Sequence, residues 1–169
     1  EDGGAPIFAE VIERVHGLGA TCEVLTPDFR GIREACDIVF EAEPDIFNHN
    51  VETVPSLYRR VRPQADYERS LKVLHWAKQE GLRTKSGIMV GLGESKEEVL
   101  EIMDDFVEIG LDVMTIGQYM QPTEQHLPVE AWVEPEVFDW YKQVGEEKGI
   151  EHVESSPLTR SSYHAEEHV

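Results

Sequence analysis

The sequence predicts an α/β fold built on a parallel sheet, in the form of a partial (β/α) barrel. Strand-like and helix-like segments alternate along the chain, and Gly81, Gly110 and Gly149 each follow a helical segment and precede a strand-like one. That repeated order is typical of βα units. The pattern holds about five strands and five or six helices, too few for a closed eight-fold barrel.

The first third of the chain alternates helix and strand. Apolar residues recur at helical spacing over 7–15, which predicts a helix. The run 21–26 has the composition of a strand, and Pro27 ends it. A helix is expected over 32–40, and the run 45–52 is expected to be the next strand.

The remaining elements have clearer boundaries. Ser95 and Glu98 form a capping box, which predicts where one helix begins. Pro135 suits the first turn of the last helix, where its missing N–H is tolerated. The sequence predicts helices over 66–79, 95–110 and 135–149, and strands over 84–90, 112–119 and 150–154.

Two levels of organisation follow. Residues 1–154 are expected to form the partial barrel, and residues 155–169 a C-terminal tail that reaches the mouth of the active site. The long segments 56–63 and 122–134 both follow strands, so they should lie at the carboxyl end of the sheet. Parallel sheets carry their active sites at that end.

Composition excludes several classes of function. The net charge is −19, from 34 acidic and 15 basic residues, which argues against binding a nucleic-acid backbone. No apolar run approaches the length of a membrane span, and no signal peptide is visible. Cys22 and Cys36 are too few for a disulfide framework or a zinc site, and they suit a reducing compartment. We therefore expect a cytoplasmic protein without a nucleic-acid or membrane partner.

The run 45–52 holds the first candidate site. Side chains alternate along a strand, so Asn48, Asn50 and Glu52 should share one face, with His49 on the other. A strand covered on both faces is expected to be almost entirely apolar. Buried polar groups need partners, so either this strand end is hydrated or it binds a polar ligand. The second interpretation is preferred here.

A glycine-rich turn, Gly87 to Glu94, is the second candidate. Its glycines would let a ligand approach the backbone, and the following helix N-terminus favours anions. An ordinary tight βα loop explains the same residues equally well. Gly3 and Gly4 form a similar, weaker case, for which a simple helix-entry turn is the alternative.

Three further groups offer polar chemistry. Gln118 and Gln121, at a strand end, supply amide donors and acceptors, although a satisfied core amide and a loop residue would look the same. Lys85 is a candidate carboxylate partner, Schiff-base amine or surface lysine. Arg, Ser, Tyr and His follow one another within residues 160–165, which is a high density of polar chemistry for a chain end. The histidines match no zinc spacing, so most are expected to be structural or exposed.

Taken together, six runs resemble lipoyl synthase, a family of radical S-adenosylmethionine (SAM) enzymes. Each run alone is modest evidence, but their order and spacing make the set specific. The runs are FNHNVETV (47–54), LYRRVRP (57–63), TKSGIMVGLGE (84–94), TIGQYMQPT (115–123), HLPVE (126–130) and RSSYHA (160–165).

The resemblance implies a partial (β/α)6 barrel that binds a [4Fe-4S] cluster and SAM at the carboxyl ends of its strands. The segment from Gly87 through Met89 and Gly91 resembles the superfamily's GxIxGxxE pattern, with Met89 where Ile is usual. Gly3 and Gly4 would then meet the methionyl amine of SAM.

The remaining cofactor roles also follow from the resemblance. Asn48, Asn50 and Glu52 would sit near SAM, and Gln121 near its adenine. In this family the tail serine of the RSSY motif ligates an auxiliary [4Fe-4S] cluster beside three cysteines, which implies Ser162, with Ser161 as the fallback. That cluster is the family's sulfur donor, replacing hydrogens at two carbons of an octanoyl chain bound to a carrier protein or lipoyl domain.

One departure from the family is large. The CxxxCxxC motif that binds the SAM cluster and the auxiliary cysteine motif are both absent, and Cys22 and Cys36 match neither. We therefore expect a fragment of the enzyme that lacks an N-terminal portion and is inactive alone. The alternatives are a non-catalytic α/β module that binds a ligand or partner, and a barrel lyase that uses Lys85.

Overall fold

Five parallel strands form the centre of the molecule in the computed structural model, which describes residues 2–163. Neighbouring strands pair in the order β1-β2-β3-β4-β5, the same as their order along the chain. The strands are β1 (Glu23–Leu25), β2 (Ile46–Asn48), β3 (Thr84–Val90), β4 (Val113–Gln118) and β5 (His152–Ser156).

Helices connect each strand to the next. The capping box of Ser95 and Glu98 is present, and Pro135 occupies the first turn of its helix, as predicted. The helices are α1 (Ala5–Gly17), α2 (Arg33–Phe40), α3 (Tyr58–Val61), α4 (Tyr67–Gln79), α5 (Lys96–Ile109) and α6 (Pro135–Lys148), with short 3-10 helices η1 (Phe29–Gly31) and η2 (Pro55–Leu57).

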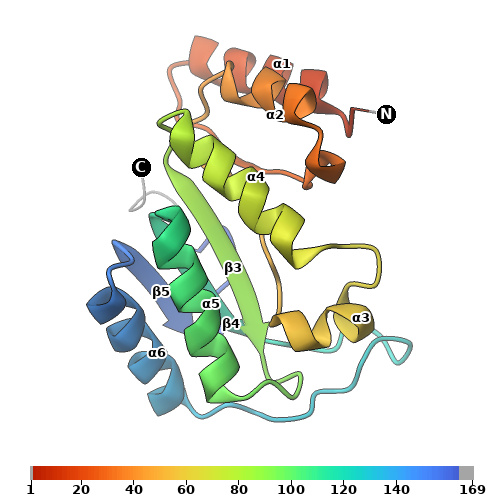
Figure 1. The fold of residues 1–169 in the computed structure, drawn as a ribbon, viewed down its shortest axis with the longest axis vertical. Helices are drawn as coiled ribbons and strands as arrows, with labels where there is room; N and C mark the ends of the chain where they lie inside the picture. The colour runs from red at the N-terminus through yellow and green to blue at the C-terminus, as the bar shows by residue number, and fades with distance from the viewer. Residues whose placement is uncertain (1, 164–169) are drawn as a thin grey trace.

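This arrangement is a segment of a barrel. The long helices α4, α5 and α6 lie on the same face of the sheet (Figure 1). A doubly wound sheet would instead reverse its strand order and carry helices on both faces. Sequential parallel strands with helices on one side are what right-handed βα crossovers produce in a barrel. The predicted partial (β/α) barrel is therefore confirmed.

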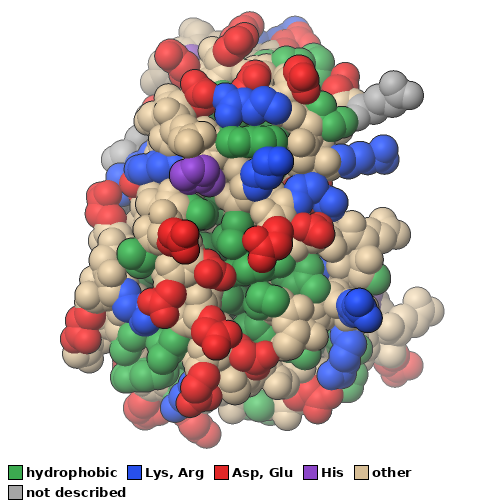
Figure 2. Space-filling view, in the orientation of Figure 1, with side chains coloured by type: hydrophobic (Ala, Val, Ile, Leu, Met, Phe, Trp, Pro, Cys, Tyr) green, Lys and Arg blue, Asp and Glu red, His purple; other side chains and the backbone are tan. Residues whose placement is uncertain are grey.

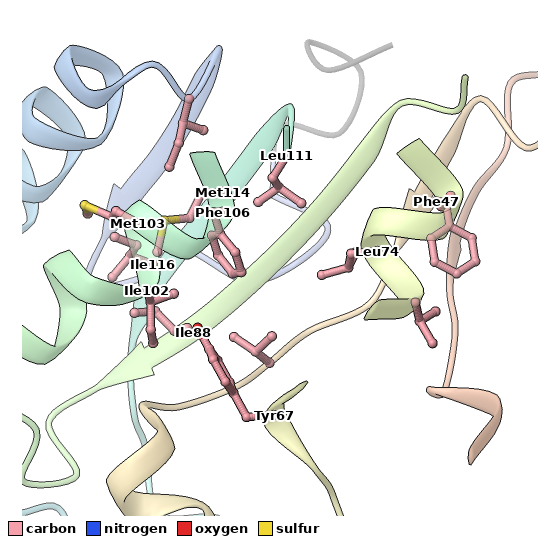
Figure 3. Packing of buried hydrophobic residues seen from close by; sticks show 14 of the residues in the cluster. Phe47, Tyr67, Leu74, Ile88, Ile102, Met103, Phe106, Leu111, Met114 and Ile116 are labelled. Carbon is pink, nitrogen blue, oxygen red and sulfur yellow. The ribbon is translucent and has the colours of Figure 1, made fainter. Parts of the chain in front are cut away.

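The hydrophobic core lies between this sheet and its helices. Phe106 of α5 and Leu74 of α4 are fully buried against strand residues that include Ile88 and Ile116 (Figure 3). Burying a side chain such as Phe106 contributes about 1.5–3 kcal/mol. Gly145 of α6 lets that helix approach β5, since a Cβ there would lie 2.9 Å from Val153. The residues between these on the strands point to the opposite, concave face.

The predicted strand over 45–52 is wrong beyond Asn48. β2 ends there, and Glu52 has φ 69°, in the left-handed region, where it forms an isolated parallel bridge with Ile88. The Glu52 N–H donates to the Gly87 carbonyl at 2.9 Å, and the Met89 N–H donates to the Glu52 carbonyl at 2.8 Å. These contacts keep the segment beside β3, but four residues from Asn48 to Glu52 span three from Lys85 to Ile88, so the regular ladder is interrupted.

Several other boundaries differ from prediction by one or two residues. β1 is shorter than 21–26, and β5 extends to Ser156, two residues beyond the expected end of the barrel at 154. Within residues 2–163, no helix is long and apolar enough to cross a membrane.

Candidate functional site

A cavity of about 440 Å³ opens at the carboxyl ends of the strands. Its size falls within the range of about 300–1,000 Å³ typical of small-molecule sites. It is lined by residues of β1, β3 and β4 and by the segments that follow β2, β4 and β5. These residues are Leu25, Asn50, Glu52, Gly87, Ile88, Met89, Thr115, Gly117, Gln118, Met120, Gln121, Pro122, Thr159, Arg160 and Ser161.

Asn50 and Glu52 supply polar groups to this cavity. The Oδ1 atom of Asn50 is buried and has no hydrogen-bond partner in the structure. Burial raises the pKa of the Glu52 carboxyl, although the charge of Arg62 and the Asn50 side chain act in the opposite direction. Arg62 is held nearby, donating to the Asn50 carbonyl at 2.9 Å. A buried acceptor without a donor and a desolvated carboxyl both favour a polar ligand here.

Two glycines of this cavity allow other residues to approach closely. A Cβ at Gly87 would lie 2.3 Å from Thr115 Oγ1 and 3.1 Å from Asn50 Oδ1. A Cβ at Gly117 would lie 2.3 Å from the Thr159 carbonyl. Glycine inside a strand often marks a close approach of another backbone or a ligand. Gly87 therefore avoids a clash with Thr115 and leaves space beside the buried acceptor of Asn50, and Gly117 admits the C-terminal segment.

Two amides of the glycine-rich turn after β3 are already occupied by a carboxylate of the same turn. The Gly91 N–H donates to Glu94 Oε1 at 2.5 Å, and the Leu92 N–H donates to Glu94 Oε2 at 2.9 Å. A Cβ at Gly91 would lie 2.3 Å from Gln118 Nε2 and 2.5 Å from the Ala131 carbonyl. The Glu94 side chain thus stabilises the turn, and Gly91 allows close packing against Gln118 and Ala131, outside the cavity lining. Of the predicted residues in this turn, Gly87 and Met89 line the cavity.

The two glutamines differ. Gln118 is buried; it donates to the carbonyls of Tyr119 and Ala131 and accepts from the Val133 N–H at 3.0 Å. Gln118 is therefore a core amide with protein partners, as the alternative interpretation from the sequence proposed. Gln121 is exposed at the cavity rim, with Nε2 donating to the His126 carbonyl at 2.9 Å.

Asn48, the last residue of β2, lies outside the cavity lining, in a buried network with Glu23 of β1 and Lys85 of β3. Its Nδ2 donates to Glu23 Oε1 at 2.7 Å, and Lys85 Nζ lies 3.0 Å from Glu23 Oε2. The Lys85 side chain is 0% exposed, so the surface-lysine interpretation is wrong and the carboxylate partner is confirmed. Because Lys85 does not line the cavity, this placement does not favour a Schiff-base amine.

Gly3 and Gly4 form the turn that enters α1, with φ of 65° and 83°. The Gly4 N–H donates to Asp2 Oδ1 at 2.9 Å, and a Cβ at Gly3 would lie 2.9 Å from the Phe29 ring. Because η1 with Phe29 follows β1, this turn lies toward the carboxyl end of the sheet. It is not part of the cavity lining.

The C-terminal segment reaches the cavity. Thr159, Arg160 and Ser161 line it, and Arg160 donates to Met120 Sδ at 3.3 Å across the opening. Ser162 follows in the same turn and is exposed, whereas Ser161 is partly buried. The predicted tail residues 164–169, with His164 and His168, lie outside the described residues.

The described residues do not supply an iron–sulfur or metal site. No group of three or more His, Cys, Asp or Glu side chains among residues 2–163 could hold a metal ion. Cys22 lies just before β1, at the opposite end of the sheet from the cavity, and Cys36 is buried in α2. Burial raises the pKa of Cys36 to about 11 and also raises the pKa of Cys22, which disfavours the thiolates that clusters require.

His49 is structural, as expected for most histidines. Its Nδ1–H donates to the Thr26 carbonyl at 2.8 Å, and Nε2 accepts from the Ser70 hydroxyl at 2.9 Å. Burial lowers the pKa of His49, so the neutral ring is favoured. The side chain joins the segment after β2 to α4.

Sequence reasoning assigned no role to three residues of this site. Thr115 and Gly117 line the cavity from β4, and Arg62 holds the backbone of Asn50. The isolated glycine inside a strand pattern was a usable signal for Gly117. Arg62 was visible only as part of a motif.

Fold and family agree. Residues 2–106 match the family model described as the radical SAM superfamily. A domain of pyruvate-formate lyase-activating enzyme from Bacteroides vulgatus superposes with a TM-score of 0.66 at 14% identity, covering 90% of this chain and 92% of that one. SuiB from Streptococcus suis superposes with a TM-score of 0.69 at 10% identity, covering 89% of this chain and 36% of that one. The chain belongs to the radical SAM superfamily.

Within that superfamily the chain is similar to lipoyl synthases. It is 55% identical to lipoyl synthase from Rubrobacter xylanophilus over 98% of this chain and 53% of that protein. It is 49% identical to lipoyl synthase from Flavobacterium johnsoniae over 100% and 60%, and 47% identical to the mitochondrial lipoyl synthase of Nematostella vectensis over 100% and 59%. The resemblance read from the six motifs is confirmed, and the chain spans little more than half the length of these relatives.

Proposed function

We propose that the cavity is the SAM site of a lipoyl synthase. The observation that carries this proposal is the buried Oδ1 of Asn50, which lacks a donor and faces the space left by Gly87. SAM offers ribose hydroxyls and an ammonium group as donors. Glu52 adds a carboxyl that can balance the cofactor's positive charge.

Other predicted residues take supporting roles in this proposal. Met89 provides an apolar surface to the cavity, and Gln121 at the rim offers an amide to the adenine. Gly3 and Gly4 would approach the methionyl amine from the turn before α1. Asn48 does not contact the cofactor in this proposal; it donates a hydrogen bond to Glu23, below the cavity.

SAM supplies a radical that removes hydrogen from an unactivated carbon, but it needs an electron from a [4Fe-4S] cluster. Cys22 and Cys36 do not fit that cluster, because they are the only cysteines and both are buried. Three thiolates would have to come from outside these 169 residues. This chain's own part is to bind and orient the cofactor.

The activity proposed for the complete protein is the replacement of hydrogens by sulfur at two carbons of a protein-bound octanoyl chain. The partner is an octanoylated carrier protein or domain. Ser162, with Ser161 as the alternative, is proposed as the oxygen ligand of the auxiliary [4Fe-4S] cluster. Support comes from the position of Ser161 in the cavity lining and of Ser162 beside it. An oxygen donor is a poor match for iron–sulfur chemistry, which suits a cluster that must open.

Two experiments test the proposal. Calorimetric titration of this chain with SAM should show one site, and Asn50→Leu, which removes the unpaired acceptor, should weaken it. The complete protein, reconstituted with iron and sulfide and given SAM, reductant and an octanoylated carrier domain, should form 5′-deoxyadenosine and the dithiolated product. Failure to form either product would refute the assignment.

A second candidate is a module that binds a ligand without chemistry, favoured by the missing thiolates. The two candidates predict different results for the complete protein. A protein that binds SAM and never forms 5′-deoxyadenosine would fit only the module.

A further inference from the structure

The arginines of this chain divide into those that form an ion pair and those that do not. Five of them lie within 4.0 Å of a carboxylate: Arg14, Arg33, Arg60, Arg69 and Arg83. Among the described residues, no such ion pair forms at Arg30, Arg59, Arg62 or Arg160, although acidic residues outnumber basic ones by 34 to 15. These four all lie in segments that follow a strand, at the carboxyl end of the sheet.

Arg59 belongs to the second group, and its neighbour on α3, Arg60, forms only an exposed ion pair. Both side chains are exposed on α3, and the partner of Arg60, Glu130, is 3.5 Å away and 47% exposed. Figure 2 shows Lys and Arg side chains over α3, whereas Asp and Glu dominate the face over α5. In so acidic a protein, this local basic surface is unlike its surroundings and would attract a negatively charged partner.

Arg60 lines a groove of about 610 Å³ that leads to the cavity, and Arg59 is its neighbour on α3. Arg60 and Arg62 line the groove, which shares Glu52, Met89, Met120 and Pro122 with the cavity. Most of its other lining is apolar, from Val61, Leu92, Tyr119, Leu127 and Pro128. A long aliphatic side chain could therefore extend from the protein surface beside α3 to the reacting centre.

We propose that Arg59 and Arg60 dock an acidic protein surface that surrounds the octanoylated lysine of the substrate. This inference rests on the proposed function, which requires a protein-bound chain to reach the cavity. Acidic side chains flanking the lysine would pair with the two guanidinium groups, and the lysyl arm would follow the apolar groove. A nucleic acid is disfavoured as the partner because the net charge of −19 repels a phosphate backbone over the rest of the surface.

The test uses synthetic peptides that carry one octanoylated lysine flanked by Glu, by Gln or by Lys residues. Affinity for this chain is measured by fluorescence anisotropy at low and at high ionic strength. At low ionic strength the Glu-flanked peptide should bind about tenfold more tightly than the Gln-flanked peptide. The difference should shrink at high ionic strength, and the Lys-flanked peptide should bind most weakly.

Variants identify the arginines responsible. The double variant Arg59→Glu/Arg60→Glu should abolish the preference for the acidic peptide, and Arg59→Gln/Arg60→Gln should reduce it. Arg14→Glu makes one of these two charge reversals at a 76% exposed position on α1 and should leave the preference intact. Thermal melts of each variant should match the parent, because these side chains are exposed.

Several outcomes would overturn the inference: equal binding of the three peptides, no measurable binding of any, or an equal effect of Arg14→Glu. An oligonucleotide that binds the parent tightly and loses affinity in the double variant would assign the surface to nucleic acid instead. The proposed function is judged separately. If the complete protein dithiolates Glu- and Gln-flanked peptides equally well, only the docking inference fails.

Discussion

Lys85 Nζ lies 3.0 Å from Glu23 Oε2, and this ion pair passes over β2 to join β3 to β1. Asn48 of β2 donates to the other carboxylate oxygen, so one carboxylate ties three strands together. The network lies beneath the segment that carries Asn50. It therefore fixes the strands from which the cavity residues project.

Lys85→Met should destabilise the protein by roughly 3 kcal/mol, because it leaves the Glu23 carboxylate buried without its cation. Glu23 keeps 16% exposure, so water offsets part of the loss. Urea unfolding followed by circular dichroism measures the change. Glu23→Gln/Lys85→Met should recover part of it, and a single variant as stable as the parent would contradict this account.

Gly87→Ala should weaken SAM binding at least tenfold and destabilise the fold by about 1–3 kcal/mol, because the new methyl meets Thr115 Oγ1. Gly17→Ala is the control, since nothing lies within 4 Å of a Cβ there. Calorimetry and thermal melts measure both quantities. In Gly87→Ala/Thr115→Ala the fold should regain stability while binding stays weak; recovery of binding would show that the space beside Asn50 is not used.

Glu52→Gln should make the protein more stable at neutral pH and weaken SAM binding. Burial raises the pKa of Glu52 above 4.5, so the native protein holds this proton more tightly than the unfolded chain. This tighter proton binding stabilises the native protein fully below pH 4.5, and the contribution is lost as pH rises through the native pKa. Melts of both proteins from about pH 4 to about pH 8 should diverge with increasing pH. Parallel curves, or the same divergence for the exposed Glu101→Gln, would exclude this explanation.

Ser162→Ala in the complete protein should reduce sulfur insertion more than tenfold and leave 5′-deoxyadenosine formation within about twofold. The reason is that loss of an oxygen ligand affects the auxiliary cluster and not SAM. Product analysis gives both rates, and iron content with the visible spectrum reports the cluster. Ser161→Ala is the comparison: if it alone has this effect, the fallback is the ligand. Equal loss of both activities in Ser162→Ala would argue against a ligand role.

Local chemistry explains which parts of the fold were predictable. The capping box at Ser95 and the first-turn Pro135 act within one helical turn, so sequence alone located both helices. The end of β2 was not predictable in this way. It depends on the left-handed Glu52 and its bridge to Ile88, which lies far along the chain.

The site shows the same division. Asn50, Glu52, Gly87, Met89 and Gln121 were correctly placed at one end of the sheet, because every strand is parallel and ends there. Asn48 was grouped with them by alternation, but its partner Glu23 stands on another strand. The anion-binding interpretation of the glycine-rich turn stays a prediction, and it is weakened because Glu94 occupies the amides of Gly91 and Leu92. That carboxylate, three residues after Gly91, was visible in the sequence.

Two of the positions that shape the cavity, Gly87 and Gly117, contribute by having no side chain. An alanine scan shortens side chains to a methyl group, so it would report what Asn50 or Arg62 does. It cannot remove a side chain from these glycines, which have none. The informative experiment on β3 and β4 replaces Gly87 and Gly117 by larger residues, one carbon at a time. Drift toward larger residues at these two points should thus abolish function in sequences whose other motifs all remain intact.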